Sequence, residues 1–460
     1  MTKTEALKQY FGHSGFRPAQ ETLIDALLSG RDVLGVMPTG AGKSICYQIP
    51  ALLMAGTALV VSPLISLMKD QVAQLKQSGI PGAYINSSLT SAQYREVIRR
   101  ASEGRYKIIY VAPERLETDE FLRYATGTRI SLVAVDEAHC VSQWGQDFRP
   151  SYLGVPRFIN MLATRPVVGA FTATATAEVK HDMERLLELR SPLSLTTGFD
   201  RPNLYFQVAK PKYKPAYFRE IISRRVGSFS ATKSSFGKAQ GSYGAGGNYY
   251  SSGGISTKSS YGAAQNSYGA GGCGIVYCAT RKAVDTIYSE LKNQGLAVAR
   301  YHAGMDDDDR RKSQDDFIGD RVAVMIATNA FGMGIDKPNV RYVIHYNMPK
   351  NLESYYQEAG RAGRDGNRSE CILMFSQDDI KIAEFFINNS EKNVELTEQE
   401  RRILFQRDYE RLDKMIGYCE TTGCLRVYLL RYFGDKYKGN CGNCGSCSAA
   451  KRQRGGMRRY

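Results

Sequence analysis

The chain has 460 residues, of which 43% are hydrophobic and 23% are charged. This length exceeds one compact core and predicts two or three domains, and the composition excludes a wholly disordered or collagen-like protein. Lys and Arg outnumber Asp and Glu by 61 to 46, which gives a formal net charge of +15. The excess favours an anionic partner whose phosphates these side chains neutralise; a basic solvated surface is the alternative.

No stretch approaches 18 uninterrupted apolar residues, and the first eight residues mix charges with no apolar run behind them. We therefore expect no secretory signal and no membrane partner. Ten Cys in such a chain indicate reduced thiols, as in the cytoplasm, with a location at the nucleoid of a bacterium or in the nucleus of a eukaryote. The cysteines in apolar sequence are expected to be small buried hydrophobes: Cys46, Cys140, Cys278 and Cys371.

Short apolar runs alternate with helical patterns in two series. The first series comprises 32–36, 57–61, 107–111, 132–135 and 167–171. The second comprises 274–278, 296–300, 322–326, 340–344 and 371–375. Near-continuous apolar strands separated by helices predict parallel sheets covered on both faces. We therefore expect an α/β fold with two tandem parallel-sheet domains, 1–205 and 273–390, and a connection at 206–226.

The composition changes abruptly over residues 227–272, which lie between the two series. This segment is almost entirely Gly, Ser, Tyr, Ala, Asn, Gln and Lys, and residues 232–247 recur as 257–272. Few aliphatic side chains offset the entropy of ordering, so we expect a disordered insert. It is either an inert flexible loop, which we favour, or a segment that self-associates through its tyrosines.

After about Ser390 the pattern becomes helical and charged, which predicts helices over 395–409 and 410–433. These belong to a small helical subdomain, 391–450, that carries a cysteine cluster. A basic tail, 451–460, is expected to be unstructured and to serve as a phosphate contact or as a solubilising end.

A loop reading Met-Pro-Thr-Gly-Ala-Gly-Lys-Ser follows the first predicted strand and opens a helical pattern, the context that a phosphate-binding loop requires. Gly40 and Gly42 let backbone amides face phosphate oxygens, Lys43 reaches the β- and γ-phosphates of ATP, and Ser44 can hold Mg²⁺. The strict pattern has Gly where Met37 stands, so an ordinary Gly-rich turn is the alternative.

An Asp-Glu-Ala-His box ends the fourth predicted strand. Its carboxylates, Asp136 and Glu137, then lie at the carboxyl edge of the sheet, where α/β proteins bind ligands. Asp136 would meet Mg²⁺ through water, and Glu137 would orient or deprotonate the attacking water. Alone, such a pair is more often a helix cap. Together with the loop at Lys43 it predicts ATP hydrolysis.

The second half carries the segment Gln-Glu-Ala-Gly-Arg-Ala-Gly-Arg-Asp-Gly, in which small residues let Arg361 and Arg364 approach another surface closely. An arginine that reaches the γ-phosphate from a neighbouring domain would stabilise transition-state charge and make hydrolysis depend on domain closure. We assign this role to Arg364, with Arg361 beside it. A surface salt bridge is the alternative.

The order of these motifs resembles the RecQ branch of superfamily-two DNA helicases over most of the chain outside the insert. Further segments that match the family stand at 16–20, 62–67, 112–115, 172–175, 199–204, 301–304 and 327–338. The resemblance implies two RecA-like domains in which Gln20, Arg17 and His13 surround adenine. It also implies that Asp336 approaches the nucleotide and that Thr328 contacts the DNA backbone.

The most discriminating stretch, His-Cys-Val-Ser-Gln-Trp-Gly-Gln-Asp-Phe-Arg-Pro, resembles the aromatic-rich loop particular to RecQ helicases. Trp144 and Phe148 can stack on unpaired bases of any sequence, and we assign Arg149 to the same DNA-binding set. Packing of both rings in the core is the alternative.

Cys441, Cys444 and Cys447 form two short Cys-x-x-Cys steps that share the middle residue, so a tetrahedral Zn²⁺ needs a remote fourth thiolate. Cys424, at the head of an expected helix, resembles the family's choice, and Cys419 is the competing candidate. The family's Cys-Arg-Arg is replaced here by Cys-Leu-Arg, a minor departure.

The resemblance implies a 3′-to-5′ DNA translocase and helicase of recombination and repair, which uses ATP, Mg²⁺ and Zn²⁺ on single-stranded and partly duplex DNA. RecQ proteins usually continue into a winged-helix domain, which we do not expect within this chain. A DNA-stimulated ATPase with little unwinding is therefore one alternative. A nucleic-acid-binding scaffold and an RNA helicase are two others; the complete nucleotide motifs disfavour the first, and the aromatic-rich loop and cysteines disfavour the second.

Overall fold

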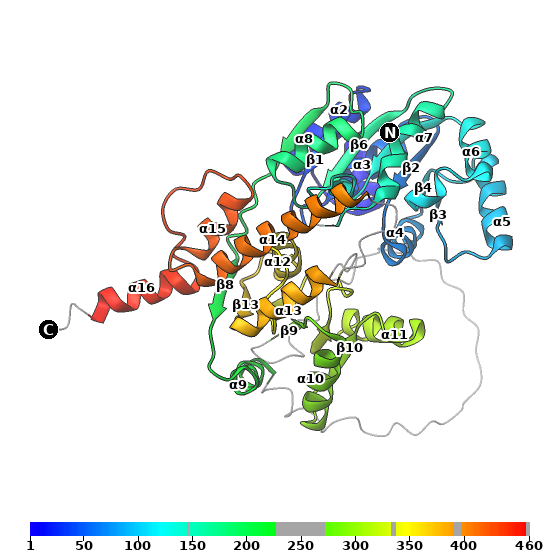
Figure 1. The fold of residues 1–460 in the computed structure, drawn as a ribbon. Coiled ribbons are helices and arrows are strands. Elements are labelled where there is room, and N and C mark those ends of the chain that lie inside the picture. The colour runs from blue at the N-terminus through cyan, green and yellow to red at the C-terminus, as the bar shows by residue number, and fades with distance from the viewer. Residues whose placement is uncertain (146, 227–271, 333–336, 390–396, 457–460) are drawn as a thin grey trace, which may run out of the picture.

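The computed structural model describes residues 1–145, 147–226, 272–332, 337–389 and 397–456, with side chains described as far as residue 450. Two parallel sheets with helices on both faces form two lobes, and a helical region with a cysteine cluster follows (Figure 1). The predicted fold class is confirmed. Residues 227–271 of the Gly/Ser/Tyr-rich insert lie outside the described residues, so the expectation of disorder stays a prediction.

The first lobe is built on a seven-stranded sheet in the order β3-β4-β2-β5-β6-β1-β7. Its strands are β1 (Val33–Val36), β2 (Thr57–Val61), β3 (Gly82–Ile85), β4 (Ile108–Val111), β5 (Ile130–Val135), β6 (Val167–Thr172) and β7 (Leu193–Thr196). The five strands expected from apolar runs are confirmed. The two edge strands, β3 and β7, were missed: β7 alternates apolar and polar residues, and β3 has only one β-branched residue, Ile85.

Each face of this sheet is covered by helices because successive side chains of a strand point to opposite faces. Leu59 and Val61 of β2 pack into one core, and Ala58 and Val60 pack into the other. The covering helices are α1 (Lys3–Phe11), α2 (Pro18–Leu28), α3 (Lys43–Leu53), α4 (Ile65–Gln77), α5 (Ser91–Ser102), α6 (Asp119–Thr126), α7 (Gly154–Met161) and α8 (Ala177–Leu186).

The second lobe has a six-stranded parallel sheet in the order β10-β11-β9-β12-β13-β8. Its strands are β8 (Leu204–Ala209), β9 (Cys273–Tyr277), β10 (Val298–Tyr301), β11 (Val324–Ala327), β12 (Val340–His345) and β13 (Ser369–Met374). Its helices are α9 (Lys214–Val226), α10 (Arg281–Asn293), α11 (Asp307–Ile318), α12 (Leu352–Ala359) and α13 (Gln377–Asn388). Because β8 pairs with β13, the segment 206–226 is part of this lobe rather than a bare connection.

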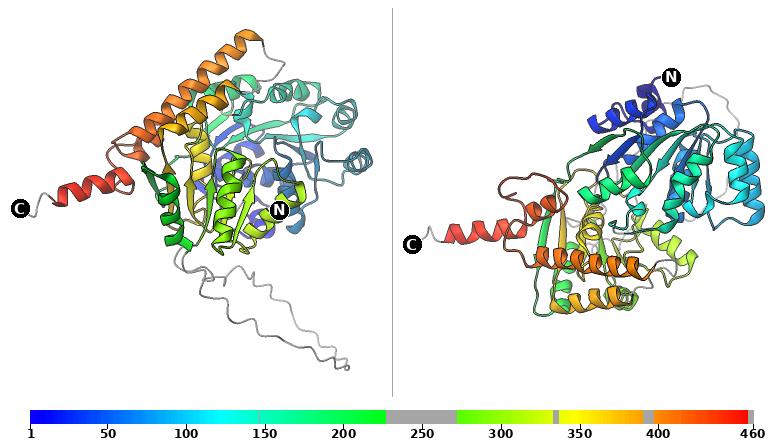
Figure 2. Two further views of the ribbon diagram at one scale, coloured as in Figure 1. Left: turned by 60° about the horizontal axis from the view of Figure 1, so that its bottom comes forward. Right: turned by 45° about the horizontal axis from the view of Figure 1, so that its top comes forward.

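The helical region comprises α14 (Glu398–Glu420), α15 (Leu425–Tyr432) and α16 (Gly445–Gly456). The predicted helix boundary at 409/410 was wrong: α14 continues to Glu420, the helix breaks at Thr421, and Cys424 is the N-cap residue of α15. The expected unstructured tail was also wrong as far as Gly456, because Lys, Arg and Gln are good helix formers and continue α16. Helix α16 projects from the body in both views (Figure 2). Within the described residues, no helix is both long and apolar enough to cross a bilayer.

Candidate nucleotide site, nucleic-acid contacts and metal centre

The phosphate-loop candidate lies between β1 and α3, at the carboxyl edge of the first sheet. Gly40 and Gly42 have φ values of 84° and 78°, in the left-handed region that glycine tolerates, and α3 begins at Lys43. The loop therefore ends in backbone amides at a helix N-terminus, which attracts anions. Met37 is buried and its φ is not positive, so this position does not require the glycine of the strict pattern.

The adenine candidates lie on the other side of the same loop. The Gln20 side chain donates to the carbonyls of Ala41 and Gly42 at 3.0 and 3.2 Å, and Arg17 Nη1 donates to the Gly40 carbonyl at 2.8 Å. Arg17 and Gln20 line a cavity of about 520 Å³ together with exposed His13. The three residues predicted around adenine are thus gathered beside the phosphate loop.

The acid pair directly follows β5. Asp136 is 6% exposed, and burial together with the Glu137 carboxylate raises the pKa of Asp136 to about 7 against the opposing charge of Lys43. Glu137 adopts a left-handed φ of 47° at the N-cap position of a short 3-10 helix, Ala138–Val141, but its side chain makes no capping hydrogen bond. A carboxyl group held near neutral pKa beside a lysine is ready to ionise against a cation.

A histidine links this acid pair to the end of β6. His139 Nδ1 lies 2.8 Å from Thr172 Oγ1 and 3.3 Å from Glu137 Oε2. Burial lowers the pKa of His139, which favours the neutral ring. The Thr172 hydroxyl donates to the Thr174 carbonyl at 3.1 Å, so His139 Nδ1–H is the donor to Thr172. Sequence reasoning treated His139 only as part of the box and missed this link.

Two arginines of the second lobe complete the site. A cavity of about 350 Å³ is lined by residues of both lobes, including Gly40, Gly42, Lys43, Ser44, Asp136, Glu137, Gln357, Arg361 and Arg364. Arg361 is buried and donates to the Gly332 carbonyl. A Cβ placed on Gly40 would lie 3.4 Å from Arg364 Cγ, so Arg364 crosses to the phosphate loop. Arg361 is therefore not a surface residue, and Arg364 is half-buried against the loop.

Arg201 joins the two lobes at this point, and sequence reasoning assigned it no role. Its Nη1 donates to the carbonyls of Thr39 and Gly360, both at 3.3 Å. Its Nη2 donates to the carbonyls of Ala362 and Gly363 at 3.0 and 2.9 Å. One guanidinium therefore fixes the segment that carries the paired arginines relative to the phosphate loop.

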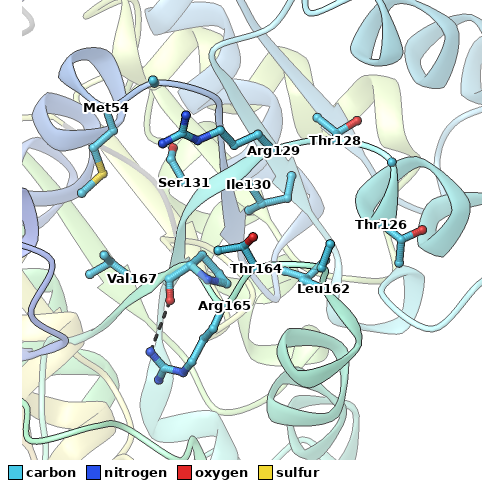
Figure 3. A pocket seen from close by; sticks show the side chains of 14 residues that line it. Met54, Thr126, Thr128, Arg129, Ile130, Ser131, Leu162, Thr164, Arg165 and Val167 are labelled. Atoms are coloured by element: carbon cyan, nitrogen blue, oxygen red, sulfur yellow. Dashed lines mark hydrogen bonds between the residues drawn. The ribbon is translucent and has the colours of Figure 1, made fainter.

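A larger cavity, of about 730 Å³, lies at the opposite edge of the first sheet (Figure 3). It surrounds the amino ends of β5 and β6 and contains none of the predicted site residues. Its Arg165 is already paired with buried Asp32 at 2.6 Å, and Figure 3 shows its bond to a neighbouring carbonyl. Its size therefore does not mark it as the nucleotide site.

The aromatic-rich loop begins in the interior, with residues 139–142 buried, and reaches the surface at Trp144. Trp144 is 40% exposed and Phe148 is half-buried, so Trp144 is not a core residue. Arg149 donates to the Pro63 carbonyl at 3.1 Å and pairs with Asp147. Thr328, which follows β11, is buried away from the nucleotide cavity. Asp336 lies outside the described residues.

The four predicted cysteines meet at one point. The sulfurs of Cys424, Cys441, Cys444 and Cys447 all lie within 4.8 Å of one another, with Cys424 to Cys444 at 3.9 Å and Cys441 to Cys447 at 4.0 Å. Sulfurs bound to one tetrahedral Zn²⁺ at about 2.3 Å lie about 3.8 Å apart, so the cluster fits that ion closely. Cys419 is buried elsewhere on α14, which excludes it as the fourth ligand.

Cys424 precedes α15, where the helix dipole favours a thiolate. Burial opposes ionisation, but hydrogen bonds from the backbone N–H groups of Cys441 and Val427, together with those from the Cys441 and Cys447 thiols, lower the pKa of Cys424 to about 7. The retained arginine of the Cys-Leu-Arg sequence, Arg426, is buried and donates to Asp200 Oδ1 and the Arg201 carbonyl, both at 2.6 Å. The cluster is thereby tied to the segment that joins the lobes.

Three family models match the chain in succession. The DEAD/DEAH box helicase model matches residues 17–182, the helicase conserved C-terminal domain matches 263–366, and the RecQ zinc-binding model matches 377–448. The last match includes all four clustered cysteines, which supports Zn²⁺ as their metal.

Among curated proteins, the ATP-dependent DNA helicase RecQ of Bacillus subtilis is 43% identical over 95% of this chain and 65% of its own length. The RecQ of Haemophilus influenzae is 38% identical over 96% of this chain and 62% of its own length. The chain thus spans a little under two thirds of these relatives.

Among solved structures, helicase MrfA bound to DNA has a TM-score of 0.63 at 16% identity, covering 95% of this chain and 59% of that one. Mss116p bound to single-stranded RNA and AMP-PNP has a TM-score of 0.64 at 16% identity, covering 94% of this chain and 89% of that one. At such low identity these structures show the fold alone. The family models and the sequence relatives together show that this chain belongs to the RecQ family of helicases.

Proposed function

We propose that this chain is an ATP-dependent DNA helicase motor that moves 3′ to 5′ along single-stranded DNA. The observation that carries the proposal is the cavity between the lobes, which combines Lys43 and the acid pair of one lobe with Arg361 and Arg364 of the other. A site completed by two lobes couples ATP hydrolysis to their relative movement, which is what a translocating motor requires.

The residues in this cavity suit phosphoryl transfer to water. Lys43 and the backbone amides at the start of α3 would hold the β- and γ-phosphates, and Arg364 would stabilise the charge that develops on the γ-phosphate. Ser44 and Asp136 would hold Mg²⁺, which when bound neutralises phosphate charge. Glu137 would accept a proton from the attacking water. Its contact with His139 would transmit this change in the protonation of Glu137 toward β6.

Single-stranded and partly duplex DNA are the proposed substrates. The support is the net charge of +15, the exposed ring of Trp144 and the names of the sequence relatives. Phe148, Arg149 and Thr328 are proposed to contact the same strand. A role in recombination and repair is part of the proposal and rests on the resemblance to the RecQ family alone.

The decisive experiment compares ATP hydrolysis with and without single-stranded DNA in the wild type and in Lys43→Ala. Stimulation by DNA that disappears in the variant supports a DNA motor. Duplexes with a 3′ or a 5′ tail then test direction, and unwinding from the 5′ tail alone contradicts the proposed polarity. Stimulated hydrolysis without unwinding of either duplex would favour a DNA-stimulated ATPase instead.

A further inference from the structure

The exposed ring of Trp144 is covered on one face by an arginine of the zinc-binding subdomain. The Cζ atom of Arg407 on α14 lies 3.1 Å from the centroid of the Trp144 ring. One helical turn further along α14, Arg411 donates to the Trp144 carbonyl. Figure 1 shows α14 extending from the subdomain toward the first lobe, so these two arginines hold the tip of the aromatic-rich loop from a distant part of the chain.

The base of the loop is held by the first lobe itself. The backbone N–H of Trp144 donates to Ser142 Oγ at 3.0 Å, and the Ser142 hydroxyl donates to Asp182 Oδ2 on α8 at 2.7 Å. The backbone at Trp144 is therefore anchored by the first lobe, whereas one face of its ring is covered by Arg407 of α14.

The guanidinium of Arg407 makes few hydrogen bonds in its position over the Trp144 ring. Its Nε and Nη1 atoms are buried, and in the part of the chain that the structure describes neither has a hydrogen-bond partner. Burial, together with the charge of Arg411, lowers the pKa of Arg407. A buried donor without an acceptor destabilises the contact that holds it there. A ligand that stacks more strongly on the ring can therefore displace Arg407.

We propose that Arg407 occupies the stacking face of Trp144 in the DNA-free protein and yields that face to an unpaired base. The inference rests on the proposed function, in which Trp144 stacks on single-stranded DNA. Base stacking on an aromatic ring and a partly desolvated cation–π contact are similar in strength, and the unpaired buried Nε and Nη1 of Arg407 shift the balance toward the base when single-stranded DNA arrives. Arg407 is thus a positioning residue through which α14 responds to DNA at the aromatic-rich loop.

The protein contains one Trp, so its emission reports this contact directly. In the DNA-free protein, Arg407→Ala should increase quenching of Trp144 by acrylamide and shift the emission to longer wavelength, because the ring loses the group that covers one face. The matched control is Arg402→Ala on the same helix, which removes an exposed arginine paired with Glu398 and should leave the emission unchanged. Wild-type quenching in Arg407→Ala would overturn the proposal.

DNA affinity gives the second test. Arg407→Ala removes a competitor whose binding has the strength of a cation–π contact. The DNA concentration for half-maximal ATPase activity should therefore be about 2- to 5-fold lower than in Arg402→Ala. The kcat at saturating DNA should not change. Arg407→Lys keeps the charge without the planar group and should fall between the two. If Arg407→Ala instead weakens DNA binding more than Arg402→Ala does, Arg407 is a DNA contact and the proposal fails. Absence of DNA stimulation in the wild type would refute the proposed function but leave the DNA-free emission result standing.

Discussion

The cysteine cluster takes its four sulfurs from one subdomain, between Cys424 and Cys447, whereas the nucleotide cavity takes its lining from two lobes, between Thr39 and Arg364. The sulfurs of the cluster already have the spacing that a bound metal requires, and no ligand from another part of the chain is needed to complete it. The cavity exists only while the lobes face one another. Substitution of a cluster ligand should therefore lower the stability of the fold, and substitution of a cavity residue should lower the rate of ATP hydrolysis.

The largest effect is expected at the cluster. Cys444→Ser should abolish zinc binding and cost several kcal/mol of folding free energy, because metal binding to such a site is part of folding. Zinc stoichiometry and thermal unfolding measure both effects. Cys419→Ala is the control, since this thiol lies outside the cluster and the variant should retain its metal. Zinc loss from both variants would contradict the assignment of Cys424 as the fourth ligand.

The next effect concerns the cavity alone. Arg364→Ala should lower DNA-stimulated kcat by about 100-fold or more, because an arginine at the γ-phosphate acts in the transition state. Thermal stability and zinc content should stay at their wild-type values. Arg361→Ala provides the contrast: this buried arginine also binds the Gly332 carbonyl, so its loss should lower both kcat and stability. An Arg364→Ala variant with wild-type kcat would exclude it from catalysis.

The cluster is local in sequence and the cavity is built from two lobes, and this difference decides how well each could be predicted from the sequence. The phosphate loop and the triple-cysteine segment are local in sequence, so spacing alone identifies them. Cys424 was preferred to Cys419 only by resemblance, because the helix expected over 410–433 ran through the break at Thr421 that separates the two residues. The segment 199–204 was recognised by resemblance, but the role of Arg201 was not, because its partner Thr39 is 162 residues away and a backbone carbonyl acceptor cannot be identified from a sequence. Fold class was accessible because buried parallel strands are continuous apolar runs, and the edge strands that break this rule were missed.

Arg201 tests whether the two regions are independent. Arg201→Ala should lower kcat by about 10-fold, since misplacement of the arginine segment is costly, and should lower stability by about 2 kcal/mol through unpaired carbonyls. Its zinc content should not change. Because the Arg201 carbonyl also accepts from Arg426, a parallel loss of zinc would show that the cluster and the cavity depend on each other.

The smallest effect is a gain of stability in the nucleotide-free, Mg²⁺-free protein. Folding raises the pKa of Asp136 from 3.8 to about 7, so between these values the folded state binds more protons than the unfolded state does. Wild-type stability should therefore fall as pH rises through this window, with the full cost present above pH 7. Asp136→Asn removes that cost and should be more stable by on the order of 2 kcal/mol at pH 8, with no difference near pH 4. Thermal unfolding of both proteins across this range measures it. If Asp136→Asn is more stable than the wild type at pH 8 and no longer hydrolyses ATP, the cavity retains a carboxylate that destabilises the fold because hydrolysis needs it. The ligands of the cysteine cluster, in contrast, stabilise the fold.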